Sequence, residues 1–383
     1  MFAMSESKLG PGITMYENET FSNESTSGYQ TAVALKDGWY VLCSSEELGS
    51  QPIRRFLHGE PLVLFRDSHG QPGVLLDRCP HRNVPLSRGR IRGGDLECAY
   101  HGWRFDKQGR CREIPCLQRD SSDAEDKLRA APCFQSCEKD GYIWAYAAID
   151  TKPDHEPPKL AYTQDSDYSV LRTHRTMECS IHAAVENALD VPHTRFVHGG
   201  LFRSGSRRMV EVIVRRWYDR VEAEYVGESC PKGLLGRLIA PGGGVVRHFD
   251  RFILPCIAQV EYILGASTHL VATVAFTPRA DFRTSMFGTV ALRTRLSQLP
   301  WPLNQSNCVL GNVLKPLGLA ILNQDRDILY AQRENIHQFK SEEYCSTELD
   351  TLGCAALQLL RSAANGKLNP DMEPRTQRFR MHA

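Results

Sequence analysis

The sequence contains no apolar run of about eighteen residues, the length that would cross a bilayer as a helix. Its first residues also lack the basic and apolar segments of a secretory signal peptide. Neither charge sign is in excess, since 46 Lys and Arg residues stand against 45 Asp and Glu residues, with a formal net charge of +1. A protein that binds nucleic acid usually carries a basic surplus. These absences argue against a membrane or nucleic-acid partner and predict a cytoplasmic protein.

Two further absences limit the electron chemistry of the chain. It has no Gly-rich dinucleotide-binding motif and no plant-type C-x4-C-x2-C iron–sulfur motif. We therefore expect electrons to arrive from a separate protein. In a chain of 383 residues without a secretion signal, the 13 cysteines are expected to be buried thiols and metal ligands rather than disulfides.

Changes in composition divide the chain into three parts. Residues 1–36 are rich in Ser, Glu, Asn and Thr and predict a loose arm. Residues 37–149 hold short apolar runs between turn signals such as DSHGQPG and KQGR, and this pattern predicts a small antiparallel β domain. The prolines of DTKPDHEPPKL, residues 150–160, predict a linker at the start of a larger unit, residues 150–383.

The larger unit mixes helices and strands. Helical spacing is found in SIHAAVENALD (180–190), in LGLAILNQDRDILYAQREN (317–335) and in LGCAALQLLRSAA (352–364). Alternating apolar and polar residues predict strands within 208–292, and the tail at 369–383 is expected to be mobile. The whole chain therefore predicts an α+β protein.

The stretch RCPHRNVPLSRGRIRGGDLECAYHGW, residues 78–103, carries a candidate metal site. Cys79 and His81 form a C-x-H pair, and Cys98 and His101 form a C-x-x-H pair. Two Cys and two His can hold a structural zinc ion, but zinc sites usually take two Cys from one turn and two His from another. One Cys and one His from each turn suit a Rieske-type [2Fe-2S] cluster, with both thiolates on one iron and both imidazoles on the other.

A second candidate site lies in VENALDVPHTRFVH, residues 185–198. On a continuous helix, His193 and His198 would point about 140° apart, because each residue turns by about 100°. Pro192 ends the helix just before them, so that the two imidazoles can converge from a helix end and the following turn. A 2-His-1-carboxylate iron site then needs one acid from elsewhere in the chain.

The stretch ILNQDRDILYAQ offers Asp325 and Asp327 as that acid. The residues three and four positions from Asp325 are all Ile or Leu, so its carboxylate is expected to point into the core. The residues around Asp327 form a face that can meet water, so Asp327 is expected to be solvated; they are Asn323, Gln324, Tyr330 and Ala331. A buried carboxylate is costly unless a cation compensates it, and Fe(II) would do so. We therefore predict Asp325 as the third iron ligand.

Both motifs together resemble the Rieske non-haem iron oxygenases. CPHR followed by CAYHGW is similar to the cluster signature of ring-hydroxylating oxygenases, and D-x-x-H-x-x-x-x-H with a distal Q-D is similar to their catalytic domain. The resemblance covers residues 37 to about 335 and implies a helix-grip catalytic fold, in which an antiparallel sheet wraps around a long helix. It implies that His193, His198 and Asp325 bind a mononuclear Fe(II), and that Asp190 bridges His101 and His193 between neighbouring subunits of a head-to-tail homotrimer.

The resemblance also implies an activity. An external reductase or ferredoxin, fed by NAD(P)H, would reduce the cluster, and O2 would be used to hydroxylate or oxidatively demethylate a small, cyclic organic substrate. We expect monooxygenation; a dihydroxylating aromatic-ring dioxygenase is the alternative. The alternative from another class is a Rieske electron-transfer or redox protein without a substrate.

Three other polar residues are candidate hydrogen-bond partners of the iron ligands. Glu186 and Asn187 lie one turn before Asp190, where they could be partners of the ligands, helix caps or solvated side chains. Gln332 lies seven residues after Asp325 and is expected to act on the ligands only indirectly, if at all.

The remaining candidates are better explained as structural. Two cysteine pairs without a histidine are expected to be buried thiols: Cys111 with Cys116, and Cys133 with Cys137. His174 and His182 are expected to be structural histidines. A basic stretch fits either an acidic ligand or solvated strand faces with interleaved glutamates; it contains Arg203, Arg207, Arg208, Arg215, Arg216, Arg237, Arg247 and Arg251.

Overall fold

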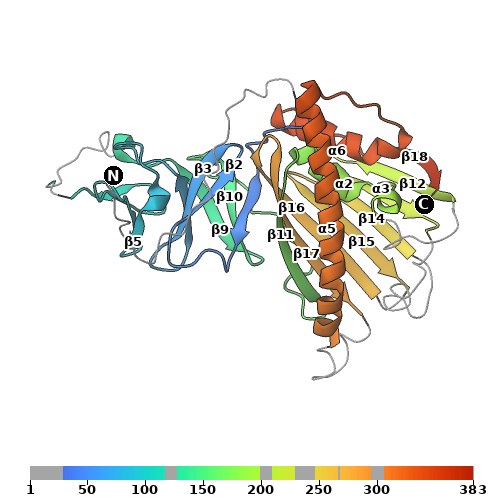
Figure 1. Ribbon diagram of the computed structural model, residues 1–383, viewed down its shortest axis with the longest axis horizontal. Coiled ribbons are helices and arrows are strands. Elements are labelled where there is room, and N and C mark those ends of the chain that lie inside the picture. Colours follow the sequence, from blue (N-terminus) through green and yellow to red (C-terminus); the bar gives the residue numbers. More distant parts are fainter. Residues whose placement is uncertain are drawn as a thin grey trace, which may run out of the picture.

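Two β units joined side by side make up the molecule, with the N-terminal unit at one end and the larger helix-bearing unit at the other (Figure 1). The computed structural model describes residues 29–115, 117, 127–198, 209–228, 246–265, 268–294 and 306–382. The predicted arm therefore lies mostly outside the described residues, as does Cys116. No helix within these ranges is long and apolar enough to span a membrane.

The N-terminal unit contains a six-stranded antiparallel sheet in the order β1-β10-β9-β4-β3-β2. Its strands are β1 (Trp39–Ser44), β2 (Ile53–Leu57), β3 (Glu60–Arg66), β4 (Pro72–Leu76), β9 (Cys133–Lys139) and β10 (Tyr142–Ile149). A smaller four-stranded sheet extends from it and carries the CPHR and CAYHGW stretches. It consists of β5 (Arg90–Arg92), β6 (Asp95–Glu97), β7 (Arg104–Phe105) and β8 (Cys111–Glu113), and the 3-10 helix η1 (Leu86–Arg88) precedes it.

The larger unit is built on an eight-stranded antiparallel sheet in the order β11-β17-β16-β15-β14-β13-β12-β18. Its strands are β11 (Ser169–Met177), β12 (Met209–Arg216), β13 (Arg220–Val226), β14 (Val246–Ile253), β15 (Ile257–Leu264), β16 (Thr268–Ala280), β17 (Arg283–Arg293) and β18 (Arg375–His382). Every neighbouring pair is antiparallel.

Helices cover one face of this large sheet, and the long α5 crosses it (Figure 1). They are α2 (Ile181–Leu189), α3 (His193–Phe196), α5 (Ser306–Phe339), η4 (Glu348–Asp350) and α6 (Thr351–Ala364). The side chain of Ser180 caps α2 by accepting a hydrogen bond from the backbone N–H of Ala183. The antiparallel sheet with its long helix confirms the predicted α+β fold.

Two details of the larger unit differ from the sequence-based expectations. The tail that was expected to be mobile forms β18, which pairs with β12 along its whole length. Phe379 and Met381 alternate with exposed residues and pack on the main core, so a period-two pattern was present but short. The long helix begins at Ser306 rather than at residue 317, and it contains Pro316.

The two units share a continuous interface. The backbone N–H groups of His58 and Gly59 donate to Pro278 O and Arg279 O at 2.7 and 2.8 Å. Strand β1 contributes to both sides, because Tyr40 belongs to the main core whereas Val41 packs in a cluster with Phe287 of β17. The two units are therefore joined by a shared core rather than by a flexible connection.

The segments expected to be a linker and an arm are also attached where they are described. The indole N–H of Trp39 donates to His155 O at 2.9 Å, which holds the proline-rich stretch against β1. Thr31 donates its backbone N–H to Glu342 Oε2 at 3.0 Å, beyond the end of α5. Both contacts place these segments on the folded units.

Candidate metal centres

The first cysteine–histidine pair lies in a tight loop after β4. The backbone N–H of Cys79 donates to Val84 O, and that of Asn83 donates to Cys79 O, both at 2.9 Å. Asn83 adopts a left-handed conformation, with φ of 61°, that closes the loop. The loop that bears Cys79 and His81 is therefore fixed by its own backbone hydrogen bonds.

The second pair lies in a matching loop between β6 and β7. The N–H of Cys98 donates to Trp103 O at 2.8 Å, and the N–H of Gly102 donates to Cys98 O at 3.0 Å. Gly102 has φ of 70°, a region that glycine adopts at little cost. The two loops thus form a pair of backbone-closed turns, each with one thiol and one imidazole.

The four side chains of these loops converge. The ring centroids of His81 and His101 lie 4.5 Å apart, and the buried Cys79 thiol is within hydrogen-bonding reach of Cys98. The indole of Trp103 stacks on His81 at 4.8 Å with an interplanar angle of 5° and fixes the ring. Burial raises the pKa of Cys79 to about 11, so the thiolate of Cys79 needs a cation to exist at neutral pH.

One atom tests whether a metal cluster fits here. His81 Nδ1 is buried and has no hydrogen-bond partner within the described part of the chain. A buried nitrogen without a partner is costly, whereas a nitrogen that coordinates a metal is satisfied. Two thiols on one side and two imidazoles on the other are the donor set of a Rieske [2Fe-2S] cluster.

The second site forms where α2 ends. Asp190 is the C-cap of α2, and the following turn with Pro192 starts the short helix α3, so the chain changes direction between the two histidines. His193 Nε2 and His198 Nε2 lie 3.3 Å apart. The pair therefore converges in the way that a helix break, rather than a continuous helix, allows.

Asp325 completes this group from α5. Its Oδ1 lies 3.4 Å from His193 Nε2 and 3.1 Å from His198 Nε2. The donor atoms of all three residues lie within 4.8 Å of one another, an arrangement that can hold one metal ion. Two imidazoles and a carboxylate on one side of a metal form the facial triad of non-haem iron sites.

The choice between the two aspartates of α5 is confirmed. The side chain of Asp325 is 9% exposed, whereas that of Asp327 is 69% exposed and pairs with Arg326 at 2.8 Å. Leu322 and Leu329, one turn on either side of Asp325, pack on the main core. The apolar neighbours of Asp325 therefore carry it into the protein, as the helical pattern predicted.

Each ligand of the triad also has a polar partner. Asn187 Nδ2 donates to Asp325 Oδ1 at 3.2 Å, so the structure brings Asn187 to the site. His193 Nδ1 donates to the backbone carbonyl of Asp190, and the Asp190 carboxylate lies 3.7 Å from the same nitrogen. Burial raises the pKa of Asp190, with a smaller contribution from the charge of Glu186.

The partner of His198 was missed by sequence reasoning. His198 Nδ1 lies 2.9 Å from Gln324 Oε1, and Gln324 directly precedes Asp325 in α5. The helical pattern places Gln324 on the same face of the helix as Asp327, which is the face expected to meet water. Its position next to a predicted ligand was the available signal, but the contact depends on where His198 lies after the turn.

Two predicted supports lie elsewhere. Glu186 points toward α6, where a Cβ added at Gly353 would come within 2.5 Å of its Oε1. Burial raises the pKa of Glu186, and the nearby charge of Asp350 adds to the shift. Gln332 lies two turns beyond Asp325, about 10 Å along the helix axis at 1.5 Å per residue. Neither residue shares the contacts of the triad.

The other candidates have structural surroundings where they are described. His174 stacks on Phe287 with ring centroids 4.4 Å apart, and His182 Nε2 lies 2.9 Å from Gly353 O. Cys111 is buried, and Cys133 and Cys137 are half-buried. Within the basic stretch, Arg215 pairs with Glu222 and Glu224, and Arg251 pairs with Glu222 and Glu261. Arg203, Arg207, Arg208 and Arg237 lie outside the described residues.

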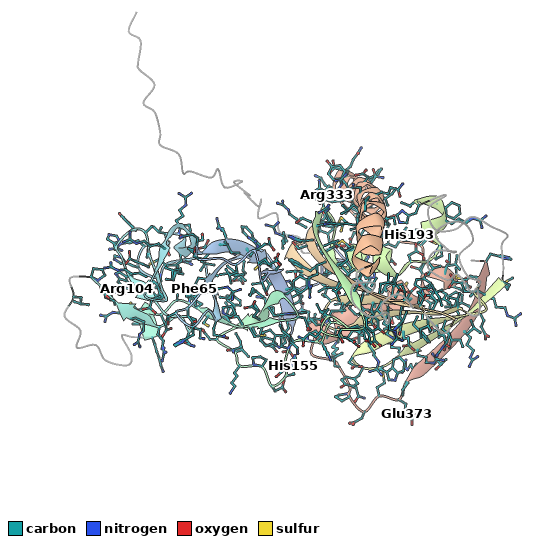
Figure 2. The ribbon with its side chains drawn as sticks, turned by 90° about the horizontal axis from the view of Figure 1, so that it is seen from below. Phe65, Arg104, His155, His193, Arg333 and Glu373 are labelled. Carbon is teal, nitrogen blue, oxygen red and sulfur yellow. The ribbon has the colours of Figure 1, made fainter. Side chains whose placement is uncertain are left out.

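The two centres lie in different halves of the chain. In Figure 2, Arg104, which follows the second cysteine–histidine loop, lies toward the far end of the N-terminal unit, whereas His193 lies in the other unit. The sheet of the N-terminal unit lies between them (Figure 1).

Comparisons with known proteins agree with both centres. Residues 38–135 match the model of the Rieske [2Fe-2S] domain, and residues 177–366 match that of the vanillate O-demethylase oxygenase C-terminal domain. The chain is 30% identical over 223 residues to the oxygenase component of chloroacetanilide N-alkylformylase from Rhizorhabdus wittichii, a match that covers 56% of this chain and 62% of that protein. It thus spans less than two thirds of that relative's length.

A further relative and a solved structure extend the likeness. Identity to aminopyrrolnitrin oxygenase from Pseudomonas fluorescens is 30% over 255 residues, covering 61% of this chain and 69% of that protein. The crystal structure of dicamba monooxygenase bound to dicamba superposes with a TM-score of 0.71 at 20% identity, covering 88% of this chain and 99% of that chain. The chain therefore belongs to the Rieske non-haem iron oxygenases, in the branch that resembles the vanillate and dicamba O-demethylases.

Proposed function

We propose that this chain is the terminal oxygenase component of a Rieske system, which uses O2 to hydroxylate or oxidatively demethylate a small, cyclic organic substrate. The observation that carries the proposal is the presence of two different metal centres in one chain. A pure electron carrier needs only the loops of Cys79 and Cys98. The buried group of His193, His198 and Asp325 has no role in such a carrier.

The residues of the chain divide the work between the two centres. When bound, the [2Fe-2S] cluster supplies electrons one at a time, and the mononuclear iron supplies open coordination positions for oxygen chemistry. His193, His198 and Asp325 would hold the iron, and the chemistry it would supply is the reaction of O2 with a bound substrate. Asn187 holds the Asp325 carboxylate, which keeps that oxygen directed at the two imidazoles.

The large sheet offers a surface for an apolar substrate. Val260, Ala272 and Val290 lie side by side in register on β15, β16 and β17. They share a face with Ala258 and Met286, which pack in the core that also includes α2. All three are only half-buried by the described residues. Apolar surface close to α2, the helix that ends just before the histidine ligands, suits an organic ring, and the O-demethylase and oxygenase relatives are consistent with it.

Electron transfer between subunits is part of the proposal. His101 is exposed and its neighbour Tyr100 is 61% exposed, so the imidazole edge of the cluster lies at the surface. The Asp190 carboxylate beside His193 is also partly exposed. A head-to-tail homotrimer would bring His101 of one subunit to Asp190 of the next, and Asp190 would then link the two centres by hydrogen bonds.

The electron donor and the cellular setting complete the proposal. An NAD(P)H-dependent reductase, acting directly or through a ferredoxin, would reduce the cluster of a cytoplasmic enzyme. We assign residues 37–149 to the Rieske domain and residues 150–383 to the catalytic domain. The six-stranded and four-stranded sheets fall in the first range, and the eight-stranded sheet falls in the second.

Metal analysis of the purified protein tests the two classes of function. The oxygenase is expected to hold about three irons and two sulfides per chain, and a carrier about two irons. The variant His193→Ala should retain the visible spectrum of the cluster, lose about one iron per chain and lose product formation. If product formation survives in His193→Ala, the catalytic assignment is wrong.

The type of oxygenation requires a separate experiment. With 18O2 and a converted substrate, a monooxygenase places one labelled atom in the product, or one in the hydroxylated intermediate that leads to demethylation. A dihydroxylating dioxygenase places two. Two labelled atoms on adjacent carbons would replace monooxygenation with the dioxygenase alternative.

A further inference from the structure

The side chain of Gln324 contacts the triad through His198. It lies on α5 immediately before Asp325, and its Oε1 is 2.9 Å from His198 Nδ1. His198 itself is almost fully buried, with 2% of its side chain exposed. The amide therefore meets the imidazole on the side opposite Nε2, the nitrogen that faces Asp325.

The contact with Gln324 determines which tautomer the neutral imidazole of His198 adopts. An amide oxygen can only accept a hydrogen bond, so the atom that faces it must be Nδ1–H. In the neutral ring, Nε2 then carries the lone pair. Because Nε2 lies 3.1 Å from Asp325 Oδ1 and 3.3 Å from His193 Nε2, that lone pair is directed into the triad.

The partners of the other two ligands differ in kind. His193 Nδ1 donates to the backbone carbonyl of Asp190, which no substitution of that side chain removes. Asp325 receives its hydrogen bond from Asn187 on α2. Only His198 depends on a side chain from the same helix that supplies the carboxylate, so α5 contributes two consecutive residues to the site.

Consecutive residues of a rigid helix keep a fixed spacing. Residues 324 and 325 differ by about 100° around α5, so one side chain enters the triad while the other reaches the outer side of the adjacent imidazole. Hydrogen bonds to the second nitrogen of a ligating histidine set its orientation and its basicity. Any iron bound by Asp325 would thus meet a histidine already oriented from the neighbouring position.

We propose that Gln324 is a positioning residue that sets the tautomer and orientation of His198 and thereby strengthens iron binding at the triad. This inference rests on the mononuclear iron of the proposed function, but it concerns binding of the metal and not turnover.

The test measures the affinity of the anaerobic, cluster-containing protein for Fe(II) by competition with a chelator. Three variants are compared with wild type: Gln324→Ala, Gln324→Glu and the control Asn323→Ala, which changes the preceding exposed residue of α5. Alanine favours helix, so neither alanine variant should weaken α5. Cluster absorbance and thermal unfolding confirm that each variant is folded.

Gln324→Ala is expected to weaken Fe(II) binding by about ten- to hundredfold, the range for loss of a hydrogen-bond partner of a metal ligand. Gln324→Glu keeps an acceptor for Nδ1–H and should bind Fe(II) at least as tightly as wild type. Asn323→Ala should be unchanged. A purely structural contribution of Gln324 would instead lower the thermal unfolding temperature of Gln324→Ala relative to Asn323→Ala.

Two results would overturn the inference: Gln324→Ala binding Fe(II) as tightly as Asn323→Ala, or Gln324→Glu binding as weakly as Gln324→Ala. If the wild-type triad takes up no Fe(II) at all, the proposed function fails, and this inference fails with it. The two failures are therefore distinguished by the wild-type measurement alone.

Discussion

His248 forms a buried ion cluster on the large sheet, and its removal should destabilise the protein strongly. The residue lies in β14 with 1% exposure. Its Nε2 donates to Asp250 Oδ1 at 2.9 Å, and its Nδ1 donates to Glu228 Oε2 at 2.7 Å. The ring is stacked between Tyr225 and Tyr262, with centroids 4.4 and 4.0 Å away. Both nitrogens thus face carboxylates, and both faces are covered by aromatic rings.

The magnitude follows from the pKa of His248. Burial by itself lowers that pKa, but the charge and hydrogen bond of Asp250, together with Glu228, outweigh burial and raise it from 6.5 to about 9. A shift of this size corresponds to about 3 kcal/mol of folding free energy. Because the folded-state pKa is the higher one, the stabilisation is complete below about pH 6.5 and is lost as the pH rises through about 9.

The assay is thermal unfolding between pH 6 and pH 10. At pH 7, His248→Leu removes the imidazolium that faces Asp250 and Glu228. The loss should cost about 3–5 kcal/mol, or roughly 6–20 °C in Tm at about 2–4 °C per kcal/mol. The fall in Tm between pH 6.5 and 9 should also be smaller in this variant. The matched control is His155→Leu, which removes an exposed histidine that pairs with Asp154 at 2.8 Å and should cost at most about 1 kcal/mol.

If His248→Leu unfolds within about 2 °C of His155→Leu at pH 7, the account of a buried, charged imidazole is refuted. An unchanged dependence of Tm on pH would refute the assignment of the titration to His248.

Three further predictions concern the metal centres and their loops. Asp325→Asn should lower the iron content by about one atom per chain while the cluster spectrum persists, whereas the exposed Asp327→Asn should change neither; iron and sulfide analysis decides this. Cys98→Ser should bleach the visible absorbance of the cluster, whereas Ser at the buried Cys111, outside the four-residue group, should preserve it. Gly109→Ala should destabilise the N-terminal unit by more than about 1–2 kcal/mol, because φ is 77° and the new Cβ would lie 1.9 Å from a backbone oxygen. The loss of cluster absorbance on heating measures this destabilisation. A variant that loses its absorbance at the same temperature as wild type would contradict the prediction.

The sequence was most informative where chemistry depends on local spacing. The iron triad could be predicted because Pro192 breaks the helix before His193, and because the apolar neighbours of Asp325 determine which aspartate is buried. The proline lies within one turn of His193, and the apolar neighbours of Asp325 lie on one helix, so neither feature depends on contacts between distant segments. The family resemblance then supplied the fold of the catalytic unit.

What could not be predicted depends on contacts between distant segments. Gln324 looked solvated on its own helix, and only the position of His198 reveals its hydrogen bond. Strand β18 carries three arginines in eight residues, and its formation depends on the free edge that β12 offers for pairing. Propensity alone does not contain that information.

The double role of β1 has a practical consequence for anyone who wishes to study the electron-accepting half alone. Trp39, Val41 and Trp144 pack with residues of the larger unit. A fragment that ends near residue 149 would therefore expose these three side chains to water. Apolar patches of this kind promote self-association. A fragment of this kind is therefore expected to remain dispersed only if that patch is redesigned with polar side chains.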